Sequence, residues 1–183
     1  MRLFVALALP GHLKREVAVL SGGIPGARWV APENYHLTLR FIGEQPAHRA
    51  AEIDDTLALL RGRGFSLVLY GLGTFAKAGR STALWVGAER NEALERLRAK
   101  IETALQRIGL EPERRRFNPH VTLARLEGVA EPRIAVYVQA HNLFRAAPVD
   151  IGHFTLFSSR PGKEQPVYMP EVEYVLDGAV SSA

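Results

Sequence analysis

The stretch Asn34-Tyr35-His36-Leu37-Thr38-Leu39 recurs later in the chain as Asn118-Pro119-His120-Val121-Thr122-Leu123. Both copies read Asn-x-His-aliphatic-Thr-Leu, and both lie in stretches typical of β-strands. Successive side chains of a strand point to opposite faces, so the Asn, His and Thr of each copy share one face. The imidazole and the hydroxyl then lie about 6.5 Å apart along the strand. Two such strands predict an acid–base site that contains two histidines.

A third copy of the shorter pattern, His153-Phe154-Thr155-Leu156, competes with this pair. Six His and seven Thr in 183 residues give only about 0.2 His-x-Thr matches by chance, so three matches are an excess. The third copy has Ile151 where the other two have Asn. We therefore expect His153 to be a structural strand residue and the matched pair to form the site.

Two histidines that face each other suit acid–base chemistry at a phosphate. Imidazole titrates near pH 6.5, so one ring can be neutral while the other is protonated. Such a pair supplies a general base and a general acid, and threonine hydroxyls can donate to phosphate oxygens. Metal binding is the competing chemistry, but a metal site usually adds a carboxylate, a thiol or a third His. The motif strands supply none of these, and the sequence predicts a site with no metal and no cofactor.

Composition excludes some classes of function and favours a polyanionic partner. The absence of Cys excludes disulfides, zinc–thiolate sites and thiol nucleophiles, and it makes a cytoplasmic location the default. The net charge is +4, and Arg provides 19 of the 23 basic residues. Arg-rich surfaces fit phosphate, and thus RNA, although a genome rich in Arg codons explains the same excess. The apolar residues 3–9 are followed by Pro10-Gly11, which favours an opening strand over a signal peptide. No apolar run is long enough to span a membrane.

The order of expected elements favours an α+β fold. Helical spacing of apolar residues predicts helices over 12–20, 46–60 and 91–108, whereas residues 132–142 fit either a helix or a strand. Gly-rich residues 71–80 are expected to form a loop. Strands are expected at residues 2–9, 35–42, 65–70, 83–87, 117–126, 149–158 and 167–176. Because several of these strands follow one another without a helix, antiparallel sheets are expected.

The paired motif resembles that of the 2H phosphoesterases, specifically the LigT-like branch described as RNA 2′,3′-cyclic phosphodiesterase or 2′-5′ RNA ligase. The resemblance covers essentially the whole chain in order. Besides the two motifs, the similar stretches are Arg2-Leu3-Phe4-Val5-Ala6-Leu7, Pro32-Glu33-Asn34, Phe41-Ile42-Gly43-Glu44, residues 80–87 with Trp85-Val86-Gly87, and Phe117 through Ala124-Arg125.

This resemblance implies a bilobal α+β fold in which two antiparallel sheets face each other across a cleft, with helices outside. We expect one such domain over residues 1–178 and a frayed tail over residues 179–183. The implied activity is hydrolysis of RNA 2′,3′-cyclic phosphate ends to 2′-phosphates, with 2′-5′ ligation as the reverse reaction. His36 would be the proton donor and His120 the proton acceptor, while Thr38 and Thr122 would bind the phosphoryl oxygens. A monomer is the default.

Other assignments stay open. Strict alternation from His120 places Arg125 on the buried face, so it reaches the phosphate only if the strand ends or bulges there. Arg114–Arg116 fits either an RNA guide or a solvated charge run, and Trp85 fits the core better than a stacking platform. The substrate could instead be a small cyclic nucleotide or an ADP-ribose cyclic phosphate. The chain could also be an RNA- or nucleotide-binding module without turnover.

Overall fold

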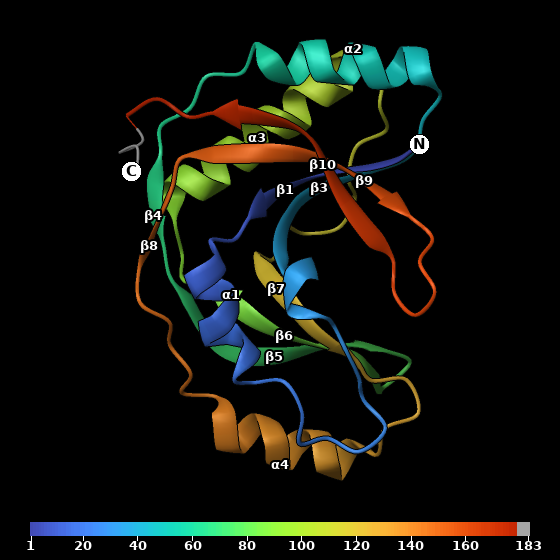
Figure 1. Ribbon diagram of the computed structural model, residues 1–183, viewed down its shortest axis with the longest axis vertical. Helices are drawn as coiled ribbons and strands as arrows, with labels where there is room; N and C mark the ends of the chain where they lie inside the picture. The colour runs from blue at the N-terminus through green and yellow to red at the C-terminus, as the bar shows by residue number, and fades with distance from the viewer. Residues whose placement is uncertain (179–183) are drawn as a thin grey trace.

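The structure is a computed structural model that describes residues 1–178, and its strands and helices are mixed along the chain (Figure 1). The strands are β1 (Arg2–Ala8), β2 (Arg28–Trp29), β3 (His36–Glu44), β4 (Phe65–Leu67), β5 (Leu69–Lys77), β6 (Arg80–Ala88), β7 (His120–Arg125), β8 (Val149–Ile151), β9 (His153–Arg160) and β10 (Val167–Val175). The helices are α1 (Gly11–Ala18), α2 (Ala47–Ala58), α3 (Glu92–Arg107) and α4 (Glu131–His141), with the 3-10 turn η1 (Pro32–Asn34) before β3. The predicted tail, residues 179–183, lies outside the described residues, and the domain boundary at 178 stays a prediction.

One large antiparallel sheet carries both motif strands. Its order is β10-β9-β1-β3-β7-β6-β5, with β2 paired to β7, while β4 and β8 form a separate two-stranded sheet. Strands β10, β9, β1 and β3 form one half of the large sheet, and β7, β6 and β5 form the other. The two halves are joined where β3 meets β7, through the single residue pair Leu37–Val121. The predicted α+β class with antiparallel sheets is confirmed, and the two predicted sheets meet at this pair.

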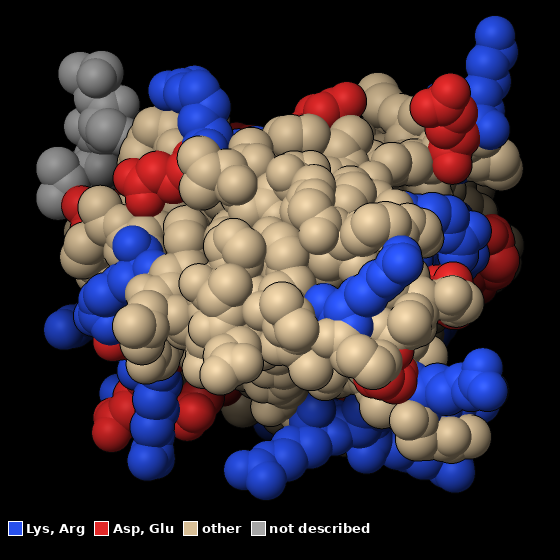
Figure 2. Space-filling view, turned by 90° about the horizontal axis from the view of Figure 1, so that it is seen from below, with Lys and Arg blue, Asp and Glu red and all other residues tan. Residues whose placement is uncertain are grey.

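The helices bury apolar side chains against the sheet. Leu94, Leu97, Ile101 and Leu105 recur at helical spacing along α3 and are buried, as predicted for this helix. The Asn91 side chain caps its first turn by accepting a hydrogen bond from the Leu94 backbone N–H. Helix α3 packs against α2 and β3, whereas α4 packs against β5 at the opposite end of the molecule (Figure 1). The surface around α4 shows few charged side chains at its centre, with Lys and Arg at its margin (Figure 2). No helix within residues 1–178 is both long and apolar enough to cross a membrane.

Both motif strands bulge at the same point of the motif. Thr38 pairs with Ala6 and Arg40 pairs with Val5, so Leu39 is an extra residue in β3. In β7, Thr122 pairs with Trp85 and Ala124 with Leu84, so Leu123 is the extra residue. A bulge places two successive side chains on the same face and thereby inverts the alternation beyond it. The residues that follow, Phe41 and Arg125, are accordingly exposed.

The predicted loop over residues 71–80 is wrong. Strand β5 continues to Lys77, and a two-residue turn at Ala78 and Gly79, both with positive φ, leads into β6. Gly71 forms a bulge, since Tyr70 pairs with Gly87 and Leu72 with Val86. Gly73 is required by close packing, because a Cβ there would lie 2.3 Å from the Trp85 ring.

Three smaller boundaries also differ from the sequence-based expectation. Residues 132–142, which fitted either element, lie mostly in helix α4. The strand expected over 149–158 is divided at Gly152 into β8 and β9, which belong to different sheets. The strand expected over residues 35–42 runs on to Glu44. Gly43 adopts a positive φ beside a bulge in the pairing with β1, and the strand continues past it.

Candidate active site

The site residues meet where β3 crosses β7. Leu37 and Val121 pair in antiparallel sense and are buried on one face of the sheet. The register places His36 toward Thr122 and Thr38 toward His120, with all four half-buried on the other face. We call this other face the site face. The two predicted His-x-Thr pairs therefore come together as one cluster at the junction of the two sheet halves.

Each histidine is held by the backbone of its own motif. His36 Nδ1 lies 2.7 Å from the Asn34 carbonyl oxygen, and His120 Nδ1 lies 2.6 Å from the Asn118 carbonyl oxygen. A carbonyl only accepts, so each Nδ1 carries a proton and donates it. Each Nε2 is left to accept or donate a proton on the site face. The Asn of the motif thus acts through its main chain, which the sequence pattern did not reveal.

The surroundings lower the pKa of both histidines. Burial has the largest effect on the pKa of His36 and lowers it, the hydrogen bond to Asn34 opposes this, and the positive charges of His120 and Lys14 lower it further. Burial also lowers the pKa of His120, against the hydrogen bond to Asn118, and the Arg125 guanidinium adds to the lowering. The lowering of the pKa of His36 by the charge of His120 is consistent with the register that brings the two motif strands together.

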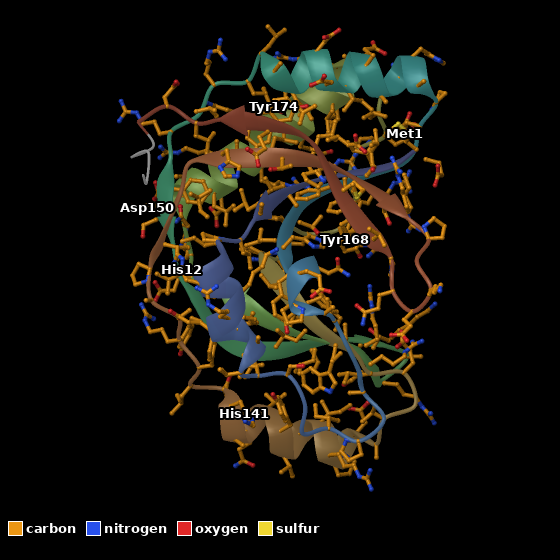
Figure 3. The ribbon with its side chains drawn as sticks, in the orientation of Figure 1. Met1, His12, His141, Asp150, Tyr168 and Tyr174 are labelled. Carbon is orange, nitrogen blue, oxygen red and sulfur yellow. The ribbon has the colours of Figure 1, made fainter. Side chains whose placement is uncertain are left out.

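Aromatic rings line the His36 side of the site. The centroid of the His36 ring lies 5.0 Å from that of Phe4, 5.0 Å from that of Tyr168 and 6.3 Å from that of Phe157. Phe4 and Phe157 stack on each other and form a small apolar cluster separate from the main core. Tyr168 projects from β10 near the middle of the molecule (Figure 3). This half of the site is therefore a wall of aromatic rings, in which the Tyr168 ring stands nearly perpendicular to the rings of His36 and Phe4.

The His120 side is lined by a different pair of rings. Phe75 lies edge-on to His120 at 4.8 Å between ring centroids, and Trp85 lies at 5.9 Å. Trp85 is half-buried, with its ring over Gly73 and against His120, so the expectation that it belongs to the core is only partly met. Phe75 lies in the segment that was expected to be a loop. The sequence therefore gave no signal that it would lie beside His120.

The bulge at Leu123 decides the place of Arg125. Strict alternation would have buried this side chain, but the inverted alternation makes it exposed, and its charge lowers the pKa of His120. The matching position on β3 is Phe41, whose relative exposure is 57%. The cation Arg125 thus lies beyond Thr122 at one end of the site, and the aromatic ring of Phe41 lies beyond Thr38 at the other.

The family model described as LigT like Phosphoesterase matches the chain twice, over residues 7–85 and 86–168. The chain belongs to this family. The first match contains His36 and Thr38, and the second contains His120 and Thr122 together with the third copy at His153. The two matches do not coincide with the two halves of the sheet, because β5 lies in the first match and β9 in the second. The predicted family is confirmed.

Curated relatives and solved structures agree with the family assignment. A protein of Aeropyrum pernix named RNA 2′,3′-cyclic phosphodiesterase is 35% identical over 162 residues, which cover 86% of this chain and 92% of the relative. A protein of Thermotoga maritima with the same name is 28% identical, and 98% of both chains is covered. The structure of E. coli LigT complexed with 3′-AMP superimposes with a TM-score of 0.79 at 26% identity, covering 96% of this chain and 98% of the other.

The third His-x-Thr copy has a different environment in this LigT-like phosphoesterase. His153 Nε2 lies 3.7 Å from a Glu173 carboxylate oxygen on the neighbouring strand, and the Thr155 side chain is fully buried. Phe157, which lines the His36 side, follows His153 by four residues, about 13 Å along a strand. Within residues 1–178, no three His, Cys, Asp or Glu side chains cluster in a way that would hold a metal ion.

Proposed function

We propose that this LigT-like phosphoesterase hydrolyses RNA 2′,3′-cyclic phosphate ends to 2′-phosphates with His36 and His120 as an acid–base pair. The observation that carries the proposal is the matched attachment of the two imidazoles, each fixed through Nδ1 with Nε2 on the shared site face. The names of the relatives support the substrate class, since both are RNA 2′,3′-cyclic phosphodiesterases. The 3′-AMP complex of E. coli LigT supports a nucleotide as the bound group.

The proposed reaction divides the proton transfers between the two rings. Neutral His120 takes a proton from water through Nε2, and the resulting nucleophile attacks phosphorus. The bond from phosphorus to the 3′-oxygen breaks, and protonated His36 gives its Nε2 proton to that oxygen. The hydroxyls of Thr38 and Thr122 donate to the phosphoryl oxygens, and Arg125 adds a charge-assisted contact. Acid and base then act on opposite sides of the phosphorus atom, as in-line displacement requires.

The lowered pKa values suit this division of roles. A neutral His120 is ready to act as the base, because burial and Arg125 disfavour its cationic form. His36 must be protonated to act, although burial lowers its pKa in the empty site. An anionic phosphate between the rings favours the cationic form of His36. Substrate binding therefore favours protonated His36, the proton donor that burial disfavours in the free enzyme.

The proposed mechanism uses no metal and accepts a second nucleophile. The rings of Phe4, Tyr168, Phe75 and Trp85 surround the two imidazoles, so each histidine meets aromatic groups where metal sites usually place carboxylates. A 5′-hydroxyl in place of water would open the cyclic phosphate in the same way, with His120 as its base, and would be joined to the 2′-phosphoryl group. A cytoplasmic location and a monomeric state stay predictions.

The test uses an oligoribonucleotide that ends in a 2′,3′-cyclic phosphate, assayed in the presence of a chelator. We expect conversion to the 2′-phosphate, and a loss of about 10²–10⁴-fold in kcat for His36→Ala and for His120→Ala. His153→Ala is the matched control and should retain activity. Full activity in either site variant would contradict the mechanism. Faster turnover of a cyclic mononucleotide or of ADP-ribose cyclic phosphate than of the oligonucleotide would favour a small substrate.

A further inference from the structure

The starts of the two motif strands are equivalent positions in the two sheet halves, but they have different neighbours. On the His36 side, the segment between β9 and β10 covers this position. The Asn34 side chain donates to the Pro166 carbonyl at 3.1 Å, and Gln165 bonds the backbone of Ala31 and Trp29 at 3.1 and 2.8 Å. On the His120 side, the Asn118 side chain is exposed, and within residues 1–178 no segment bonds to it in this way. The position beside Asn118 is therefore open, in contrast to its equivalent beside Asn34.

A pocket lies at this open position. Its volume is about 420 Å³, and it is lined by Ala88, Arg90, Glu95, Arg116, Phe117, Asn118 and Pro119. The floor is well fixed: the Ala88 backbone N–H donates to the Pro119 carbonyl at 3.1 Å, and the Arg98 guanidinium covers the Phe117 ring at 5.5 Å. Asn118, whose carbonyl holds the His120 ring, is part of the wall. Pro119, which directly precedes His120, also lines the pocket, so the pocket adjoins the start of β7.

The charge of the pocket suits an anion. Arg90 and Arg116 line it, and within residues 1–178 neither guanidinium lies within 4.0 Å of a carboxylate, whereas Arg28, Arg96 and Arg145 are paired. Glu95 offsets part of this charge, which leaves the lining with a net charge of about +1. Unpaired guanidinium groups favour bidentate contacts to phosphate. A carboxylate beside them can accept a hydrogen bond from the amino group of a base.

The position beside His120 also decides which part of a nucleic acid the pocket would face. In the proposed reaction the nucleophile approaches from the His120 side, and the ribose with the cyclic phosphate lies on the His36 side. The two sides are opposite, because attack and departure are in line. The pocket is thus on the side from which a strand with a free 5′-hydroxyl would attack.

We propose that this pocket binds the 5′-terminal nucleotide of a second RNA strand, the acceptor in 2′-5′ ligation, with Arg90 and Arg116 on the phosphodiester that follows it. This inference rests on the proposed function. The acceptor 5′-oxygen attacks the cyclic phosphate and passes its proton to His120. The bond from phosphorus to the 3′-oxygen breaks, and that oxygen takes the proton of His36. The products are a 2′-5′ phosphodiester and a free 3′-hydroxyl, with no other reactant.

The experiment measures hydrolysis of a mononucleoside 2′,3′-cyclic phosphate, with and without an unlabelled 5′-hydroxyl oligoribonucleotide. We expect the oligonucleotide to inhibit the wild-type enzyme and to be joined to a cyclic-phosphate donor. In Arg90→Ala/Arg116→Ala, its inhibition constant should rise about tenfold, and the ligated fraction should fall. The slope of log affinity against log salt should decrease by about 0.7, because one phosphate is no longer neutralised. The KM for the mononucleotide should change less than twofold.

Arg63→Ala/Arg133→Ala is the matched control, since it removes two exposed arginines elsewhere and should leave the inhibition constant unchanged. An enzyme that hydrolyses the mononucleotide but is neither inhibited by the oligonucleotide nor able to ligate it would overturn the inference. Equal inhibition of the wild type and Arg90→Ala/Arg116→Ala would do the same. Failure to hydrolyse any cyclic phosphate would instead refute the proposed function.

Discussion

At the residue scale, main-chain atoms do much of the positioning. The carbonyl oxygens of Asn34 and Asn118 fix the tautomer of His36 and His120, so both rings present the same nitrogen to the site face. The side chain of Asn34 makes a separate bond to Pro166. In the proposed mechanism the motif therefore combines two tasks in one short stretch, since the Asn orients the ring and the Thr four positions later binds the phosphate.

Arg125 provides the first prediction at this scale. If its guanidinium binds the phosphoryl oxygens, Arg125→Met should lower kcat/KM about 10- to 100-fold, and Arg125→Lys should lower it less. The control is Arg96→Met, which removes an exposed arginine on α3 that is paired with Glu92. Steady-state kinetics with the cyclic-phosphate oligonucleotide provide the measurement. Unchanged kcat/KM in Arg125→Met would show that the guanidinium faces the site without binding the phosphate.

The second prediction concerns pH. The pKa values of both histidines are lowered from the usual value of 6.5, so the optimum of kcat/KM for the free enzyme should lie below pH 6.5. Lys14 is one of the positive charges that lower the pKa of His36. Because Lys14→Met removes that charge, it should raise this pKa and move the profile toward higher pH. A profile that stays in place or moves toward lower pH would contradict the assignment.

At the scale of elements, the β5–β6 hairpin positions the His120 side of the site. It places Phe75 and Trp85 against His120, and it does so through a glycine that leaves room for the Trp85 ring. The two motif bulges act in the same way, because each reverses which side chains reach the site face beyond the threonine. Irregular points of the sheet therefore determine the composition of the site as much as the regular strands do.

Gly73→Ala tests the packing of this hairpin. The added Cβ would lie 2.3 Å from the Trp85 ring, so the ring must move, and we expect the free energy of unfolding to fall by about 1–3 kcal/mol. Urea denaturation measures the change. Gly11→Ala at the start of α1 is the control, because its Cβ would meet only ordinary contacts and Ala favours a helix. A neutral Gly73→Ala would show that the hairpin adapts.

Sequence periodicity predicted the elements whose signal is local. The apolar stripe of α3, the motif strands and the alternation that brings each His and Thr to one face all follow from the spacing of residues. The bulge at Leu123 could not be predicted, because it depends on the partner strand, and for that reason the sequence left open whether Arg125, a candidate phosphate ligand, lies on the buried face or the site face. Gly71 and Gly73 were interpreted as a loop because a glycine selected by packing has the same sequence signature as one selected by a turn. Residues 132–142 had too weak a periodicity to decide between helix and strand.

At the scale of the whole molecule, a buried network of charges connects the two motif strands. Arg40, in the β3 bulge, is 8% exposed, and its Nε lies 2.7 Å from a Glu102 carboxylate oxygen on α3. Its other nitrogens reach the Glu111 carbonyl and the Glu113 carboxylate in the segment that leads to β7. The Arg40 guanidinium therefore contacts both helix α3 and the segment that precedes β7.

A double-mutant cycle on this network gives the fourth prediction. Arg40→Met should lower the free energy of unfolding by about 3–5 kcal/mol, because Glu102 is left buried without its partner. Arg40→Met/Glu102→Leu should recover a large part of this loss. The cycle is completed by Glu102→Leu alone, and a loss in the double variant equal to the sum of the two single losses would show that the pair is not coupled. Thermal or urea unfolding at pH 7 is the measurement.

The same network predicts how stability depends on acid. Burial alone would raise the pKa of Glu102, but hydrogen bonds from Gln106 and the Glu113 N–H, with the charges of Arg40 and Arg98, lower it below its usual 4.5. A carboxyl with a depressed pKa stabilises the fold above pH 4.5, and this stabilisation is lost as the pH falls through the depressed pKa. The stability difference between the wild type and Glu102→Gln, measured by urea titration, should therefore shrink below pH 4.5.

The attachment of both imidazoles through Nδ1 has a consequence for repeated catalysis. After one hydrolysis in the proposed roles, His36 has lost its proton and His120 has gained one, so the spent enzyme is in the state that suits the reverse reaction. Since each Nδ1 proton is engaged by a carbonyl, recharging with solvent protons takes place at Nε2, where product also sits. In the proposed roles, the protons can therefore be reset only once the 2′-phosphate product has left Nε2, so product release must precede the next hydrolysis.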